Sequence, residues 1–174
     1  MERKWLKYLD KQDDQLTLNI RRAERTDAAT VFRFIRALAE YEKLLDKVDA
    51  REEDILRDLF GPEPRVFCEI AEWEGQPVGF ALWFYTYSTF RGRHGIWLED
   101  LFVQPEYRGK GIGKALMIEL ARRCAEEGLP RFAWWVLNWN QPSIDFYKAM
   151  GAVMLDEWTV CRVEGEALTA LAAR

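Results

Sequence analysis

Residues that commonly build metal sites, disulfide frameworks and histidine-based triads are scarce in this sequence. It contains one histidine, His94, and three cysteines, Cys68, Cys124 and Cys161, among 174 residues. Because the cysteines are odd in number, widely spaced and set in apolar segments, they predict buried thiols of a cytoplasmic protein rather than disulfides or metal ligands. A single histidine also disfavours a Ser-His-Asp triad, so we expect no metal centre and no triad of that kind.

Long hydrophobic runs and an excess of positive charge are also absent. No apolar run is long enough to span a membrane, and the N-terminus does not resemble a signal peptide. The formal net charge is −4, with 49% hydrophobic and 31% charged residues, so no basic field favours nucleic acid or an anionic membrane as a partner. We expect one soluble globular domain whose mildly acidic surface suits a cationic ligand.

The most informative segment is rich in glycine and runs from Arg108 to Gly113. It follows a strand-like run, 96–103, and precedes a helix-like run, 114–127. Glycines at alternate positions let a ligand approach the backbone closely, and a helix N-terminus offers free N–H groups and partial positive charge. The segment therefore predicts a cradle for a phosphate or pyrophosphate, with Arg108 and Lys110 adding charge.

The spacing of these glycines excludes two common phosphate-binding motifs. A Walker A loop requires Gly-Lys-Ser/Thr, but Ala115 follows Gly113 and Lys114. The dinucleotide fingerprint Gly-x-Gly-x-x-Gly also fails, because the third glycine comes one residue too early. Considered alone, the segment is also compatible with a tight turn and a helix cap that bind nothing.

Two segments together carry a family resemblance. The pattern Arg-x-x-Gly-x-Gly from Arg108, after the run 99–103, resembles the acetyl-CoA loop of the GNAT superfamily of N-acetyltransferases. The segment 140–152 resembles the second half of the same cofactor site: a loop, then a short helix with Pro142 in its first turn and Gly151 after its end. The implied cosubstrate is acetyl-CoA, without a metal. The residues implied to bind it are Leu101, Phe102, Val103, Arg108, Gly109, Lys110, Gly111, Ile112, Gly113, Lys114, Asn140, Ser143 and Tyr147.

The resemblance also implies catalytic roles for two residues. Glu99 matches a glutamate that acts as the base, through water, and Tyr147 matches the general acid that protonates the departing thiolate. A backbone N–H near Phe102 or Val103, unpaired where the sheet splays, can stabilise the oxyanion. From the residues alone, Tyr147 can equally be a core aromatic, and Glu99 and Asp100 ordinary strand carboxylates. Adjacent strand residues point to opposite faces, so only one of the two acids lines a pocket unless a bulge intervenes.

The pattern of apolar residues predicts an α/β chain, and the resemblance implies the GNAT fold: a mixed, mostly antiparallel central sheet flanked by helices and splayed at the acetyl-CoA site. We expect an N-terminal extension over 1–15 and one acetyltransferase domain over 16–174. Met1 to Asp14 can form a short amphipathic helix or a frayed terminus. The expected strands are 16–22, 65–73, 78–87, 96–103, 132–137, a strand around Val153 and 159–163. The expected helices are 27–41, which Thr26 or Asp27 can cap, a second capped by Asp49 with Glu52, 114–127 and one containing Tyr147.

Further segments resemble the diamine acetyltransferase group, which includes spermidine/spermine and thialysine acetyltransferases. They are 38–43, 87–92, 97–103 and 139–142. Polyamine-acetylating members carry an aspartate where this chain has Ser88, and Ser88-Thr89-Phe90 is closer to the thialysine branch. The resemblance therefore implies a small cationic primary amine such as thialysine, and a homodimer. The implied amine-binding residues are Tyr41, Glu42, Ser88, Phe90, Glu99 and Asp100.

Three alternatives remain open at this level. One is a polyamine acetyltransferase, and another is a non-catalytic acyl-CoA-binding module that regulates a partner. The third is a nucleotide-binding interaction domain.

Overall fold

The computed structural model describes residues 18–174 and divides the chain into two compact units, Met1–Trp135 and Val136–Arg174. The expected N-terminal extension, 1–15, and the first two residues of the expected strand 16–22 lie outside the described residues. Within the described part of the chain, no helix is both long enough and apolar enough to cross a membrane.

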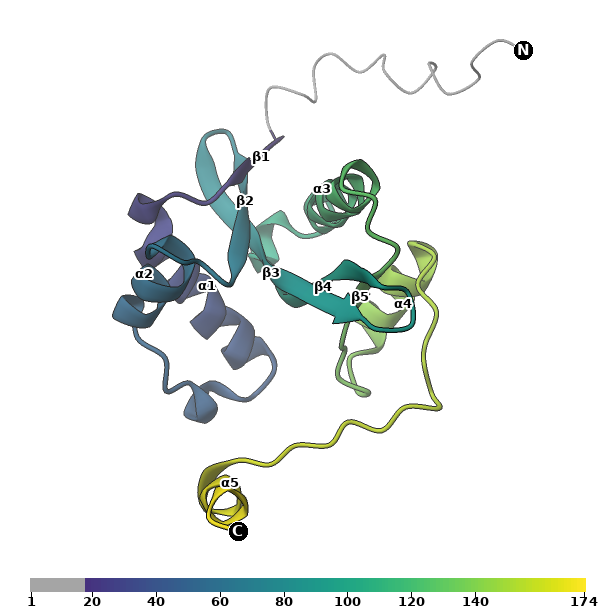
Figure 1. The fold of residues 1–174 in the computed structure, drawn as a ribbon. Helices are drawn as coiled ribbons and strands as arrows, with labels where there is room; N and C mark the ends of the chain where they lie inside the picture. The colour runs from purple at the N-terminus through teal and green to yellow at the C-terminus, as the bar shows by residue number, and fades with distance from the viewer. Residues whose placement is uncertain (1–17) are drawn as a thin grey trace, which may run out of the picture. The chain divides into compact units, whose positions relative to one another are not determined.

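The first unit is built on a five-stranded sheet with the strand order β1-β2-β3-β4-β5 (Figure 1). The strands are β1 Leu18–Arg22, β2 Phe67–Trp73, β3 Gln76–Ser88, β4 Arg93–Val103 and β5 Phe132–Trp134. The first four pair antiparallel, and β5 pairs parallel to β4. The five strands expected in this unit are confirmed, although β5 ends earlier than the run 132–137 indicated.

Helices cover the two faces of this sheet (Figure 1). On one face lie α1 Ala28–Tyr41 and α2 Glu52–Phe60, and on the other lies α3 Ile112–Glu126. The short 3₁₀ turns are η2 Arg25–Asp27, η3 Leu45–Lys47 and η4 Pro105–Tyr107. The core on the α1 face includes Val31 and Phe34 of α1 with Phe80, Leu82 and Phe102 of the strands. The apolar spacing that predicted α1 therefore does mark its buried side.

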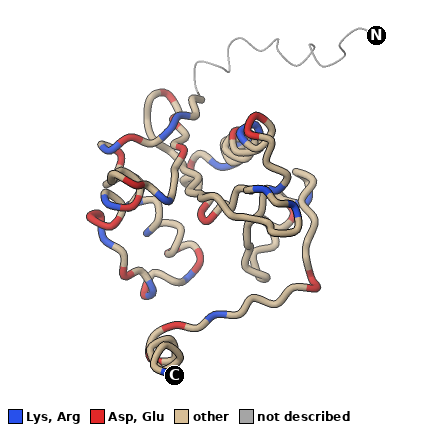
Figure 2. Tube along the Cα trace, viewed as in Figure 1, with Lys and Arg blue, Asp and Glu red and all other residues tan. Residues whose placement is uncertain are grey.

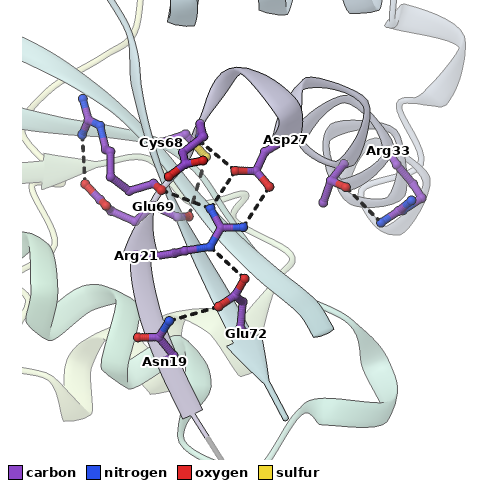
Figure 3. Close-up of polar contacts among 10 residues, drawn as sticks. Asn19, Arg21, Asp27, Arg33, Cys68, Glu69 and Glu72 are labelled. Atoms are coloured by element: carbon purple, nitrogen blue, oxygen red, sulfur yellow. Dashed lines mark hydrogen bonds and ion pairs between the residues drawn. The ribbon is translucent and has the colours of Figure 1, made fainter. Parts of the chain in front are cut away.

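Asp27 precedes α1 but its carboxylate does not cap the helix (Figure 3). It accepts two hydrogen bonds from Arg21, at 2.7 and 2.9 Å, and one from the Glu24 N–H at 2.8 Å. Arg21 also donates to Glu72 on the neighbouring strand β2 at 2.7 Å. The hydrogen bonds from Arg21 are the main reason why the pKa of Asp27 is lowered. The expected capping role is replaced by an ion-pair network that ties β1 and β2 to the start of α1.

The start of α2 is also shifted from the expected cap. The carboxylate of Asp54 accepts from the backbone N–H of Arg51 at 2.9 Å, so the capping pair is Arg51 with Asp54 rather than Asp49 with Glu52. Arginine is not a preferred N-cap residue, so the sequence pattern favours Asp49, and the position at which the helix begins after η3 overrides that preference.

The second unit contains two helices, α4 Gln141–Ala149 and α5 Gly165–Ala172. The strands expected around Val153 and over 159–163 are wrong, because the described residues 152–164 contain no strand. Apolar side chains in this segment are exposed, including Val153, Trp158 and Val160. The alternation typical of a strand is present, but a strand forms only where another strand pairs with its backbone.

Candidate active site

The glycine-rich loop lies directly before α3, as the sequence predicts. Gly109 and Gly111 have φ values of 76° and 80°, and a Cβ on either would meet nothing within 4 Å. Gly111 is the N-cap of α3, so the N–H groups of Ile112, Gly113 and Lys114 have no carbonyl within the helix to bond. Open space above a left-handed turn, together with free N–H groups, fits a pyrophosphate.

The two basic side chains of the loop lie against aromatic rings. The Arg108 guanidinium lies 4.8 Å from the Tyr41 ring centroid, and its Nε donates to the Val103 carbonyl at 2.9 Å. The Lys110 ammonium lies 4.8 Å from the Trp73 ring centroid. Arg108 therefore joins the loop to the end of β4 and to α1. Over the rest of the described residues, Lys and Arg alternate with Asp and Glu along the chain and do not form one basic region (Figure 2).

A β-bulge in β4 determines where the two adjacent acids point. Leu82 of β3 pairs with Asp100, but the next residue, Trp83, pairs with Leu98, so Glu99 is an extra residue in β4. Leu82 belongs to the core under α1, whereas Trp83 contacts Arg123 of α3 on the opposite face. Asp100 therefore lies on the α1 face and Leu98 on the α3 face.

Glu99 lies on the same face as Asp100. Its carboxylate accepts a hydrogen bond from the indole N–H of Trp97 at 3.0 Å, and the Trp97 ring packs against Phe84 on the α1 face, with centroids 6.5 Å apart. The bulge that the sequence left open is thus present. It brings both carboxylates to one side of the sheet.

The third acid of this group is Glu42, directly after α1. Burial, followed by the charges of Glu99 and Glu42, raises the pKa of Asp100 to about 7. Burial also raises the pKa of Glu42. Acids that are pushed toward their neutral form in this way are typical of a site that receives a cation. Tyr41 precedes Glu42, and its ring contacts the Arg108 guanidinium.

Ser88 and Phe90 lie apart from these acids. They occupy the tip of the β3–β4 hairpin, where the Ser88 hydroxyl accepts from the Arg91 N–H at 3.3 Å and Phe90 is 97% exposed. Ser88 is five residues beyond Trp83, which places it roughly 17 Å along the strand from the bulge. Within one chain, Tyr41, Glu42, Glu99 and Asp100 are brought together, and Ser88 and Phe90 are not.

The sheet opens between β4 and β5 beside the bulge. The parallel pairing ends at Leu98 with Trp134, while β4 continues to Val103. The β5-facing backbone edge over 99–103, which includes Leu101, Phe102 and Val103, therefore has no strand partner among the described residues. This is the splay that the fold class predicts, and it leaves backbone N–H groups available to a ligand.

The second unit carries three of the expected site residues. Asn140 is the N-cap of α4, and its side-chain oxygen accepts from the Ser143 N–H at 3.4 Å. Pro142 lies in the first turn, and Gly151 after the helix has a φ of 91°. Asn140 and Tyr147 are both buried. Asn140 thus has a structural function in α4 whatever else it contacts.

Comparison with known proteins identifies the family. The model of the Acetyltransferase (GNAT) family matches residues 29–152. The chain is a GNAT acetyltransferase. Thialysine N-epsilon-acetyltransferase of Bos taurus is 42% identical over 166 residues, which cover 89% of this chain and 97% of the relative. Human spermidine/spermine N(1)-acetyltransferase-like protein 1 is 34% identical over 163 residues, which cover 88% of this chain and 23% of that protein.

Solved structures support the same fold. An integron cassette protein from the mobile metagenome of V. cholerae superposes with a TM-score of 0.77 at 28% identity, over 91% of this chain and 99% of that one. The expected fold class and activity are therefore confirmed: this GNAT enzyme is an acetyl-CoA-dependent N-acetyltransferase that transfers acetyl to an amine. These relatives give no support to a non-catalytic acyl-CoA-binding module or to a nucleotide-binding domain. Among the described residues, no group of three or more His, Cys, Asp or Glu side chains is placed to hold a metal ion.

The sequence argument missed Trp97 and Trp135. Their rings meet edge to face with centroids 4.9 Å apart. One sequence signal could have indicated Trp97. It lies two positions before Glu99, and residues two apart point to the same face of a regular strand.

Proposed function

We propose that the acceptor of this GNAT enzyme is a small primary amine of the lysine type, such as thialysine. The observation that carries the proposal is the bulge, which brings Glu99 and Asp100 to one face of the sheet beside Glu42. The charges of Glu99 and Glu42 act on Asp100, and a region with this much negative charge suits an ammonium group on a short stem. Relatives named for thialysine and for L-ornithine, the latter in Arabidopsis thaliana at 38% identity over 125 residues, point to the same class of amine.

The proposed mechanism follows from the cost of removing a proton. An alkylammonium has a pKa near 10.4, so presenting the neutral amine at pH 7 costs roughly 4–5 kcal/mol. Glu42 and Asp100 hold the cation, and Glu99 accepts its proton, directly or through water. The neutral amine attacks the thioester carbonyl, and the resulting oxyanion is stabilised by a backbone N–H of the open β4 edge near Phe102 or Val103. For Tyr147 we propose the role of general acid toward the departing thiolate.

The proposed acetyl-CoA site of the first unit comprises the glycine loop, the start of α3 and the β4 edge. For Asn140, Ser143 and Tyr147 of the second unit, we propose acetyl-CoA binding from the family resemblance alone. The expected acetyl-CoA binding rests on the open space above Gly109 and Gly111 and on the free N–H groups of the helix. We also infer that the enzyme is a homodimer in the cytoplasm. The exposed apolar residues after α4 support an interface, and the three free cysteines suit a reducing compartment.

The amine preference is tested by steady-state kinetics with acetyl-CoA and a panel of lysine, thialysine, ornithine, diamines and spermidine, with free CoA detected. We expect a higher kcat/KM for thialysine or another lysine-like amine than for spermidine. The reason is that Ser88 supplies no carboxylate for the distal charges of a polyamine. A strong preference for spermidine in the wild type would replace this proposal with a polyamine acetyltransferase.

A variant sharpens this test. Ser88→Asp should raise kcat/KM for spermidine relative to thialysine, because residue 88 lies roughly 17 Å along the strand from the bulge and only an extended amine reaches it. Thr89→Asp, at the neighbouring position of the hairpin, is the matched control for added charge. An equal gain for both amines would mean that Ser88 does not select the acceptor.

The glycine loop is tested by Gly111→Ala. We expect acetyl-CoA affinity to fall about 10-fold, because the methyl group enters the space proposed for the pyrophosphate and the residue resists its φ of 80°. Isothermal titration calorimetry measures the affinity. Gly92→Ala is the control, since Gly92 also has positive φ (61°) and open space but lies in the β3–β4 turn. Equal losses of affinity in the two variants would remove the loop from the proposed site.

A further inference from the structure

Glu99 needs a means of holding its carboxylate in place. As the extra residue of the bulge it has no partner directly across on β3, and its side chain is exposed. A free glutamate side chain samples several rotamers, and ordering it costs conformational entropy. A base that must meet one ammonium proton works best when that ordering is already done in the folded protein.

The indole N–H of Trp97 supplies one fixed contact. It donates to Oε2 of Glu99 at 3.0 Å. A charge-assisted hydrogen bond of this kind is directional, and an indole donates without accepting, so it cannot compete for the proton that Glu99 takes up. The bond occupies one carboxylate oxygen and leaves Oε1 for the amine or a bridging water.

The position of Trp97 is itself determined by two aromatic contacts. Trp135, the residue after β5, meets it edge to face at 4.9 Å and an interplanar angle of 81°. Phe84 of β3 packs on it with centroids 6.5 Å apart. Edge-to-face pairs of this separation are stabilising beyond simple burial. Residues of β3, β4 and the end of β5 therefore hold one indole ring in place.

We propose that Trp97, braced by Trp135, is a positioning residue that orients the Glu99 carboxylate toward the acceptor amine. The proposal rests on the proposed function in one respect, namely that Glu99 accepts the proton of the amine. Trp97 touches neither the thioester nor the leaving thiolate in this scheme. It acts only through Glu99, so its effect should vanish when Glu99 can no longer serve as a base.

A double-mutant cycle tests this dependence. Trp97→Phe keeps an aromatic ring against Trp135 but removes the donor, and we expect kcat to fall about 5- to 10-fold with unchanged affinity for acetyl-CoA. In the Glu99→Gln background the same substitution should change kcat less than 2-fold, because residues acting as one unit are not additive. A loss of equal size in both backgrounds would mean that Trp97 acts by packing, and would overturn the proposal.

Trp83→Phe provides a matched control. The Trp83 indole also donates to a carboxylate, that of Glu69, at 3.4 Å, but it does so on the α3 face. Trp83→Phe should lower Tm and leave kcat near the wild-type value. If Trp83→Phe lowers kcat as much as Trp97→Phe does, then loss of either indole on this sheet is enough to lower kcat, and the proposal fails.

An NMR measurement separates the contact from the activity. In ¹⁵N-labelled enzyme, the indole N–H resonance that disappears in Trp97→Phe identifies Trp97. Glu99→Gln should shift that resonance more than any other indole signal, with or without turnover. Absence of this shift overturns the proposal. A clear shift combined with full activity of Glu99→Gln would refute the proposed base and leave the Trp97 contact standing.

Discussion

Tyr147→Phe is expected to lower kcat about 100-fold while changing the affinity for acetyl-CoA less than 2-fold. A general acid contributes roughly 10²- to 10⁴-fold to a rate. A thiol with a pKa near 8.5 leaves readily, so we expect the lower end of that range. Steady-state kinetics with the best amine of the panel gives kcat, and calorimetric titration gives the affinity.

Two comparisons make this result specific to the phenol. Phenylalanine keeps the ring that packs beside Phe146, with centroids 5.3 Å apart, so urea unfolding should show a folded variant. Tyr87→Phe removes a hydroxyl from an exposed tyrosine, which is 57% accessible on β3, and should leave kcat unchanged. Wild-type turnover in Tyr147→Phe would make Tyr147 a packing residue of α4 rather than the acid.

Asp100→Asn is expected to lower kcat/KM for the amine about 30-fold at pH 8. Removing one partner of a buried charge pair costs about 2–5 kcal/mol, and the lower value applies because Glu42 and Glu99 remain to hold the cation. Glu40→Gln is the matched control, because Glu40 is an exposed acid near the end of α1, two residues before Glu42. Equal effects of the two substitutions would show only a general loss of negative charge.

The pH dependence of kcat/KM should also report the role of Asp100 in binding the amine. Since the pKa of Asp100 is raised to about 7, its carboxylate becomes charged only as the pH rises through that value. In the wild type, kcat/KM for the amine should therefore increase up to about pH 7 and then level off, while the amine itself stays cationic. Asp100→Asn should remove this rise. A profile that keeps its midpoint near 7 in the variant would assign the titration to another group.

Stability should respond to Asp100→Asn in the opposite direction. The folded protein binds a proton on Asp100 up to about pH 7, whereas the unfolded chain loses it near pH 4. The folded state therefore holds more protons between these values, and its stability falls as the pH rises from about 4 to 7. Asparagine carries no such cost, so urea unfolding at pH 8 should show a more stable variant. A gain in stability with a loss of activity is typical of a residue kept for function.

The sequence by itself determined the features that depend on local chemistry. The glycine loop at the start of α3 follows from glycine's access to positive φ and from the free N–H groups of a helix terminus, so its position could be predicted. The same holds for the strands up to β5 and for the helices α1 to α4, because their apolar spacing is matched to the face that each buries. Helix α5, Gly165–Ala172, was not predicted. The motifs around Arg108 and Asn140 were sufficient to indicate the family.

Tertiary structure alone decided how the acids are arranged. Whether Glu99 and Asp100 share a face depends on one extra residue in the pairing of β4 with β3, and no local preference of Glu99 fixes that register. The ring contacts of Trp97 come from Phe84 of β3 and from Trp135 after β5, and Glu42 after α1 influences Asp100 of β4. Likewise, Asp27 looks like a helix cap in sequence but lies within reach of Arg21, and the charge pair prevails. Residues 152–164 show the opposite case: a strand-like pattern does not form a strand when no backbone pairs with it.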